Sequence, residues 1–315
     1  MAKLIPVFDA HCDFLNEWDD LSVLKQRVER ESSRGHWDLV RFREGGGVIQ
    51  IAVIWTPPNL TGKEAFHHAM EQMERVLTWA EKNTDILSIV RRKRDLMLDD
   101  SRIKLLISLE GASPLIGSPR NLRLFFQLGV RALTLTWNHR NELADGVSVS
   151  ADPSGLTDAG RLVVAECERL GVAVDVSHLA ERGFWDLCKI AQKPFFASHS
   201  NLKGLCNDRR NLSDKQSRAL AEKGGIACLT FVPEFTGDGG LVKFVRHYER
   251  ACNLIGAGAV GLGSDFDGCT NPILPDSSCY PSLADALYEG GFSRADVRKL
   301  FGGNLRRYFR ATLPS

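Results

Sequence analysis

The sequence predicts an α/β fold, a single (β/α)8 barrel of the TIM type that spans residues 1–315. Three observations support this prediction. Eight short, β-rich apolar runs alternate with longer segments of helical period, which implies parallel strands joined by right-handed crossovers. The runs are apolar on both faces, as expected where helices cover a sheet. Polar side chains gather at their C-terminal ends, and a barrel brings those ends together at one mouth.

Each strand candidate is a run of eight to ten residues that is rich in β-branched and other apolar side chains. An open, doubly wound sheet fits the same alternation. The polar residues at nearly every strand end favour the barrel, because a barrel gathers all of those ends around one mouth. The predicted strands cover residues 4–13, 46–55, 104–112, 130–137, 171–178, 194–201, 224–232 and 259–268.

Helices are predicted between these runs, from apolar residues at spacings of three and four. Thr157, Ser213 and Ser293 are the expected N-caps of three of them, and glycine residues mark where the same three helices should end. The predicted helices cover residues 64–82, 156–170, 212–225 and 293–303.

Composition argues against several classes of function. Lys and Arg number 40 and Asp and Glu 39, a net charge of +1, so there is no electrostatic case for a nucleic-acid or anionic-membrane partner. No apolar run is long enough to cross a bilayer, and the N-terminal residues lack the long apolar core of a signal peptide. We therefore expect a cytoplasmic protein whose eight cysteines, none of them in a C-x-x-C pair, are free thiols.

Potential metal ligands stand at the C-terminal ends of five of the runs. Residues two apart on a strand point to the same face, so we expect His11 to share a face with Asp13, and Asp265 with Asp267. Imidazoles and carboxylates that converge on one mouth suit divalent ions such as zinc. The full set is His11, Asp13, Glu110, His178, His199, Asp265 and Asp267.

The number of these groups indicates more than one ion. Four would fill one tetrahedral site, whereas five or more, with one bridging carboxylate, suit two ions about 3.5–4 Å apart whose shared water becomes the nucleophile. Taken singly, each residue has a structural explanation: His178 or His199 as a hydrogen-bonded core histidine, Glu110 as a capping or ion-pairing residue. Together, buried without metal or partners, they would cost several kcal/mol. The sequence therefore predicts a two-metal hydrolase.

The same residues lie in blocks that resemble the membrane (renal) dipeptidase family of zinc metallopeptidases. The matching blocks are DAHCD, LEG, RALTLT…N…AD, GLTDAGRLVVAECERLGVAVDVSHL, FFASHSN, LC, RNLSD and GLGSDFDG. Their order and spacing extend the resemblance nearly from end to end. It implies a (β/α)8 barrel with two zinc ions that hydrolyses dipeptides by a metal-bound hydroxide, and it implies a homodimer.

The resemblance also implies a role for each site residue. Asp265 matches the catalytic acid/base, and Arg210 matches the arginine that binds the substrate carboxylate. The metal ligands implied are His11 and Asp13 for one ion, His178 and His199 for the other, and Glu110 as the bridge between them.

The sequence departs from the well-studied branch of the family next to the substrate. Trp137 stands where that branch has a histidine that hydrogen-bonds the substrate, and EGASP replaces its EGGH block. We expect His139 or Asn138 to reach the substrate or the oxyanion instead. Trp137 either shapes a wall of the substrate site or caps the barrel core.

A zinc-dependent dipeptidase is the leading interpretation, with tolerance of a D-residue at the C-terminal position. The alternative is a binuclear hydrolase of another amide, such as an N-acyl or cyclic amino-acid derivative. A non-catalytic barrel that serves as a scaffold is disfavoured, because the five ligand positions and Asp265 are all intact.

Overall fold

A closed ring of eight parallel strands forms the centre of the computed structural model, which describes residues 4–97, 100–149 and 154–315. The ring closes between its first and last strands, where the Asp13 N–H donates to the Phe266 carbonyl at 2.9 Å and the Asp265 N–H to the His11 carbonyl at 3.1 Å. The predicted barrel is therefore confirmed. In ring order the strands are β1 (Val7–Cys12), β2 (Gly47–Trp55), β4 (Ile103–Glu110), β5 (Val130–Thr134), β6 (Ala173–Asp175), β7 (Phe196–Ala197), β8 (Ile226–Leu229) and β9 (Val260–Leu262).

All eight predicted strands are present, but the later ones are shorter than expected. β6 to β9 have two to four residues each, because the polar residues that follow them turn out of the ladder at the mouth. A further strand, β3 (Leu87–Ile89), was not predicted; it pairs with β4 outside the ring. Three residues are too few to give a period-two pattern, so the sequence carried no signal for it.

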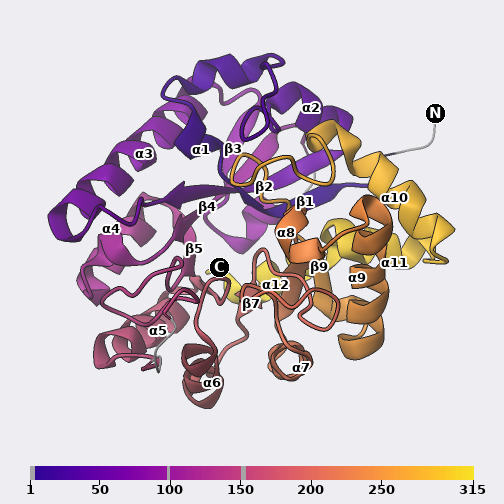
Figure 1. Cartoon of the computed structure of the whole chain (residues 1–315). Coiled ribbons are helices and arrows are strands. Elements are labelled where there is room, and N and C mark those ends of the chain that lie inside the picture. The colour runs from indigo at the N-terminus through magenta and orange to yellow at the C-terminus, as the bar shows by residue number, and fades with distance from the viewer. Residues whose placement is uncertain (1–3, 98–99, 150–153) are drawn as a thin grey trace.

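Helices surround the strands (Figure 1). The three predicted N-caps are confirmed: Thr157 accepts from the backbone of its helix, as do Ser213 and Ser293. The helices are α1 (Phe14–Glu17), α2 (Leu39–Glu44), α3 (Gly62–Lys82), α4 (Pro119–Leu128), α5 (Asp158–Leu170), α6 (Glu181–Ile190), α7 (Asp214–Glu222), α8 (Pro233–Thr236), α9 (Gly240–Ile255), α10 (Tyr280–Glu289), α11 (Arg294–Arg298) and α12 (Asn304–Thr312).

The helical segment that begins after Ser293 is interrupted at the predicted glycine pair, although a further helix follows at once. α11 leads into a π-helical turn, η6 (Lys299–Gly303), in which Gly302 has non-helical backbone angles (φ 168°, ψ −18°), and α12 begins after this kink. Glycine is needed at 302 because a Cβ there would lie 2.8 Å from the backbone nitrogen of Phe8. Gly302 thus allows this turn to pack closely against the start of β1.

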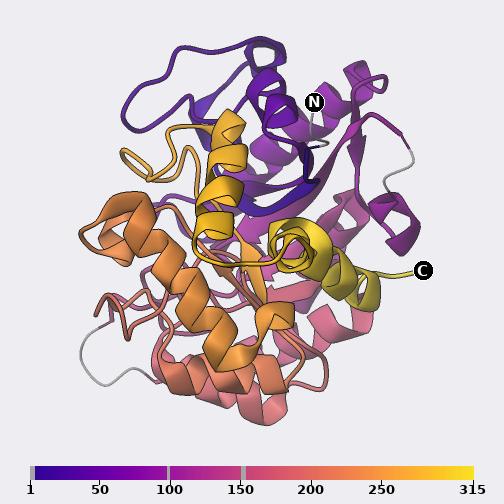
Figure 2. The same cartoon turned by 90° about the vertical axis from the view of Figure 1, so that its right-hand side faces the viewer.

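α12 closes the N-terminal end of the barrel. Its Phe309 ring packs 5.5 Å from the rings of Phe8 on β1 and Phe196 on β7, measured between ring centroids. Figure 2 shows α12 in yellow at one end of the molecule and the long loops at the other. The N-terminal end of the barrel interior is therefore closed by α12, and the barrel opens to the surface at the C-terminal ends of its strands.

Two further expectations can be compared with the structure. All eight cysteines are free thiols, as predicted. Within the described ranges, no helix combines the length and the apolar character that a membrane crossing requires.

Candidate metal centre and active site

A cavity of about 490 Å³ opens at the mouth of the barrel, and all of the predicted site residues except His139 line it or lie just beneath it. His11 is buried directly below, with 2% of its surface exposed. The structure thus brings together side chains from five strand ends, from His11 near the start of the sequence to Asp265 near its end. The lining includes Asp13, Glu110, His178, His199, Arg210 and Asp265.

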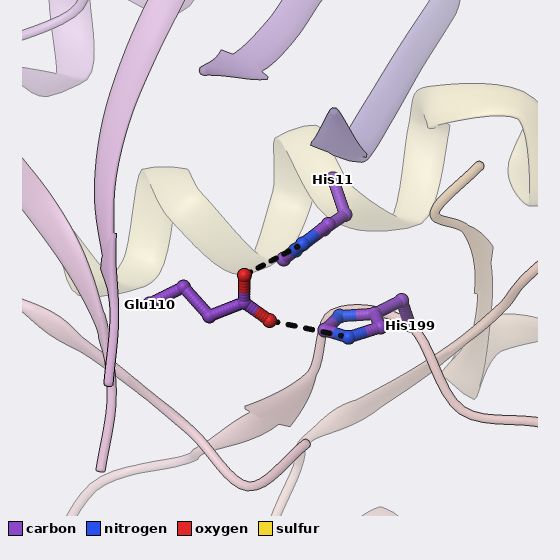
Figure 3. Close-up of side chains that lie close together, drawn as sticks. All are labelled: His11, Glu110 and His199. Atoms are coloured by element: carbon purple, nitrogen blue, oxygen red, sulfur yellow. Dashed lines mark ion pairs between the residues drawn. The ribbon is translucent and has the colours of Figure 1, made fainter. Parts of the chain in front are cut away.

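Glu110 lies at the centre, and its two carboxylate oxygens face different imidazoles. Oε1 is 2.8 Å from Nε2 of His178 and 3.5 Å from Nε2 of His199. Oε2 is 3.6 Å from Nε2 of His11. Figure 3 shows Glu110 between His11 and His199, with one oxygen directed toward each. A carboxylate in this position can contact two cations at once.

One half of the cluster is built around His11. Its Nε2 is 3.3 Å from Oδ2 of Asp13 and 3.7 Å from Oδ1 of Asp265. This nitrogen is buried and has no hydrogen-bond partner among the described residues. The ligand atoms of His11, Asp13 and Asp265 all lie within 4.8 Å of one another. Asp265, one of the potential ligands named from the sequence, is therefore near enough to contact the same cation.

The other half is formed by His178 and His199, whose Nε2 atoms are 2.9 Å apart. His178 Nδ1 is 2.7 Å from Oδ1 of Asn138. A side-chain carbonyl oxygen can only accept, so Nδ1 carries the proton and the Nε2 of His178 presents a lone pair. That lone pair faces a second imidazole nitrogen and a carboxylate oxygen. Acceptors crowded in this way fit a divalent cation between them.

Three site residues have backbone angles that are rare outside glycine. His178, Asp265 and Asp267 have φ values of 67°, 63° and 62°, in the left-handed region that is costly for other residues and clusters at functional sites. All three lie within the predicted strands but beyond the ends of β6 and β9 in the structure. The expected shared face of Asp265 and Asp267 therefore does not hold: Asp265 faces His11, whereas Asp267 accepts a hydrogen bond from the His36 N–H at 2.7 Å.

The pKa values of Asp265 and Glu110, two buried carboxyls near His11, are shifted in opposite directions. Burial raises the pKa of Asp265 to about 8, and the negative charges of Asp13 and Glu110 act in the same direction. Burial alone would also raise the pKa of Glu110, but its His11 and His178 neighbours lower it. A fixed anion thus stands beside a carboxyl that can exchange a proton near neutral pH.

The two histidines of the second half are held neutral. Burial, together with the charge of Arg210, lowers the pKa of His178 to about 3. Burial and the charge of His11 lower the pKa of His199 well below its ordinary value. Neutral imidazole is the form that binds metal ions.

Arg210 provides a buried cation at the cavity wall, in the loop between β7 and α7. It is 6% exposed, its Nη2 donates to the His199 carbonyl at 3.3 Å, and its guanidinium lies 5.2 Å from the centre of the Phe235 ring. Its Nε has no partner among the described residues. A guanidinium with an unused N–H beside a cavity is suited to binding a carboxylate.

The three residues after β5 that were expected to contact substrate differ in position. Trp137 and Asn138 line the cavity, but the side-chain amide oxygen of Asn138 already accepts a hydrogen bond from His178. His139 is exposed, is not among the lining residues, and packs its ring 5.6 Å from that of Trp137. The structure therefore does not bring His139 to the site, and it gives Asn138 a partner other than substrate.

Several residues of the site were not singled out from the sequence. Asn16 donates to Oδ1 of Asp13 at 2.8 Å, and Trp55, at the end of β2, packs edge-to-face on Trp137 at 5.4 Å between centroids. Ser198 lies beneath two imidazoles. The available signals were the helical spacing of three between Asp13 and Asn16 and the position of Trp55 at a strand end.

Comparisons with known proteins agree with this geometry. Residues 1–313 match the membrane dipeptidase family (peptidase family M19). The dipeptidase aclJ of Aspergillus oryzae is 36% identical over 326 residues, which cover 96% of this chain and 77% of the relative.

Two solved structures are similar over nearly their whole length. The dipeptidase AC, a metallo peptidase of family M19, has a TM-score of 0.91 at 28% identity, covering 99% of this chain and 100% of that chain. A metallo peptidase from Rhodobacter sphaeroides, liganded with a phosphinate mimic of the dipeptide L-Ala-D-Ala, has a TM-score of 0.90 at 27% identity, covering 98% and 100%. The chain therefore belongs to the membrane dipeptidase family, peptidase family M19.

Proposed function

We propose that this protein is a metal-dependent dipeptidase that works with two divalent ions. The position of Glu110 carries the proposal. One of its carboxylate oxygens faces His178 and His199 and the other faces His11, at distances of 2.8 to 3.6 Å from their Nε2 atoms. Family membership supports the reaction. The dipeptide mimic bound by the Rhodobacter sphaeroides relative supports tolerance of a D-residue at the C-terminal position.

The side chains present fit two cations on chemical grounds. The orphaned Nε2 of His11 and the facing Nε2 atoms of His178 and His199 are acceptors that lack donors. In this proposal His11 and Asp13 hold one ion, His178 and His199 hold the other, and Glu110 contacts both. Two ions so held would activate a water molecule and polarise the peptide carbonyl. The mixed nitrogen and oxygen ligands make zinc the proposed metal.

Asp265 is the proposed proton carrier. Its Oδ1 lies 3.7 Å from Nε2 of His11, at the cavity wall where the attacking water would be held. Burial raises its pKa to about 8 when no metal is bound, and two nearby cations would lower that pKa and favour the ionised form. The ionised carboxylate can take a proton from the water and pass it to the leaving amine.

Arg210 is the proposed anchor for the substrate's free carboxylate. Only one of its N–H groups is engaged within the described chain, by the His199 carbonyl, so the guanidinium retains donors for a carboxylate. An anchor at a fixed distance from Glu110 and the imidazoles favours a terminus one residue beyond the scissile bond. This arrangement selects dipeptides over longer peptides.

Trp55 and Trp137 form the proposed wall on the other side of the cavity. Both indoles line it, and their edge-to-face contact fixes their orientation. Such a wall would limit the access of bulk water to the peptide bond and pack against the N-terminal residue of the substrate.

The deciding experiment couples metal counting to activity. Bound metal per chain would be measured by elemental analysis, and L-L and L-D dipeptides would be assayed before and after chelation. About two ions, with hydrolysis that chelation abolishes and zinc restores, is the expected result.

Blocked substrates test the alternative in the same assay. Turnover of N-acyl or cyclic amino-acid derivatives in place of free dipeptides would replace the proposed substrate while keeping the metal centre. Two bound ions with no hydrolysis of any amide would favour a scaffold. Residence in the cytoplasm and assembly as a homodimer remain predictions.

A further inference from the structure

One buried hydroxyl lies beneath both halves of the metal cluster. The Oγ of Ser198 is 2.7 Å from Nδ1 of His199 and 3.3 Å from Nδ1 of His11. Ser198 is 2% exposed, so no bulk water competes for these contacts. The two imidazoles belong to opposite sides of Glu110, yet they share this single partner.

The carboxylate of Asp175, at the end of β6, determines where the hydroxyl proton of Ser198 points. Its Oδ2 is 2.6 Å from Ser198 Oγ and also accepts from Thr134 Oγ1 at 2.8 Å. Its Oδ1 accepts from the backbone N–H groups of Ser177 and Ser198 at 3.0 and 2.9 Å. A short hydrogen bond to a carboxylate is about twice as strong as one between neutral groups, so the Ser198 hydroxyl donates to Asp175.

The two lone pairs of the Ser198 oxygen then determine which nitrogen of each imidazole carries a proton. A serine oxygen has one proton to donate and two lone pairs that accept. With the proton directed at Asp175, both lone pairs accept N–H groups, one from His199 Nδ1 and one from His11 Nδ1. Each imidazole therefore keeps its proton on Nδ1, so Nε2, which faces Glu110, is the nitrogen left to bind a metal ion.

We propose that Ser198, oriented by Asp175, is a positioning residue that sets the tautomer of one histidine ligand of each metal ion. The inference rests on the proposed two-ion site. It implies that a single hydroxyl controls the affinity for both ions. His178 is independent of it, since its Nδ1 bonds to Asn138 instead.

The test measures zinc affinity directly. Metal-free protein would be titrated with Zn²⁺ in the presence of a competing chelator, and both dissociation constants would be determined for wild type and variants. Ser198→Ala should weaken both binding steps by roughly 10–100-fold, the usual effect of losing such an outer partner. Asn138→Ala should weaken only one step.

Ser200→Ala is the matched control. It removes an equally buried hydroxyl, two residues further on, which contacts Ser177 Oγ at 3.3 Å rather than an imidazole. It should bind two ions as the wild type does. Circular dichroism and thermal unfolding would establish that each variant is folded.

Asp175→Asn provides a second route if Ser198→Ala does not fold. The amide can donate to Ser198 Oγ and occupy one lone pair, which would turn the single hydroxyl proton toward one of the two imidazoles and impose the wrong tautomer there, so the affinity for at least one ion should fall. Wild-type affinity for both ions in Ser198→Ala, or a loss confined to one ion, would overturn the inference alone. A wild-type protein that binds no zinc would overturn the proposed function as well.

Discussion

Replacement of Arg210 by methionine should identify the group that recognises the substrate's carboxylate. Methionine retains an unbranched apolar stem of similar reach and removes the guanidinium. The guanidinium is 6% exposed and lines the cavity beside His199. Loss of one partner from a buried, hydrogen-bonded charge pair costs about 2–5 kcal/mol. At about 1.4 kcal/mol per tenfold change, kcat/KM for a free dipeptide should fall by roughly 30- to 5,000-fold.

A substrate without the carboxylate separates this effect from general damage. L-Ala-L-Ala and its C-terminal amide would be assayed with wild-type protein and with Arg210→Met, in a cycle of enzyme and substrate changes. The amide should be a poor substrate of both proteins, with kcat/KM differing by less than about threefold between them. For the free dipeptide, the kcat/KM of Arg210→Lys should lie between those of the wild type and Arg210→Met, because an ammonium keeps the charge but lacks the planar, two-pronged donor of a guanidinium.

Equal losses on the acid and the amide would refute the reasoning. They would mean that Arg210 acts through the His199 carbonyl, which it also contacts, or through the charge of the metal cluster. Metal content per chain, measured on the same samples, would distinguish these two causes.

Three further results are expected. Asp265→Asn keeps an oxygen directed at His11, so it should retain two ions while kcat falls by roughly 10²–10⁴; metal analysis beside steady-state kinetics tests this, and wild-type turnover would reassign the proton carrier. Gly302→Ala places a Cβ 2.8 Å from the Phe8 nitrogen and should destabilise the fold by about 1–3 kcal/mol in urea unfolding, whereas Gly258→Ala, with open space around it, should be nearly neutral. Burial lowers the pKa of His247 from its ordinary value of 6.5, so the unfolded chain binds a proton there before the folded one does, and the free energy of unfolding should decline as the pH falls below about 6.5. That decline should be smaller in His247→Gln than in the wild type. If the urea midpoint depends equally on pH in these two proteins, His247 does not contribute to the decline.

The fold could be predicted because the strand and helix signals were strong and repeated. Eight apolar runs alternated with helical segments, and N-caps such as Thr157 and Ser213 marked helix starts that the structure reproduces. The glycine pair at 302–303 marked a break in the helix that the structure reproduces as a kink at Gly302. The second use of Gly302, its close approach to β1, depends on tertiary contacts that no local pattern contains.

The candidate ligands could be found from sequence because parallel strands of a barrel end at one mouth. Residues such as Glu110 and His199 could be identified as candidate ligands from their position at a strand end alone. The substrate contacts could not be placed in the same way. Whether Asn138 or His139 reaches the cavity depends on how the loop after β5 turns, and the structure leaves His139 exposed. Ser198 precedes His199 directly, yet its role depends on the packing of β1 and β6 around it.

The arrangement of charge around the mouth explains why a free dipeptide suits this site. Arg210 follows β7, and the order of the ring places β7 opposite β2, which ends at Trp55. Arg210 is the one arginine or lysine among the described residues that line the cavity, whereas Glu17 lines it on the side of β1, next to β2, and Glu234 lines it after β8. A dipeptide anchored by its carboxylate at Arg210 and crossing above Glu110 would direct its α-ammonium toward the Glu17 carboxylate. An N-acyl derivative would bring no positive charge to that side, so the polarity of the cavity favours the free amine over the blocked one.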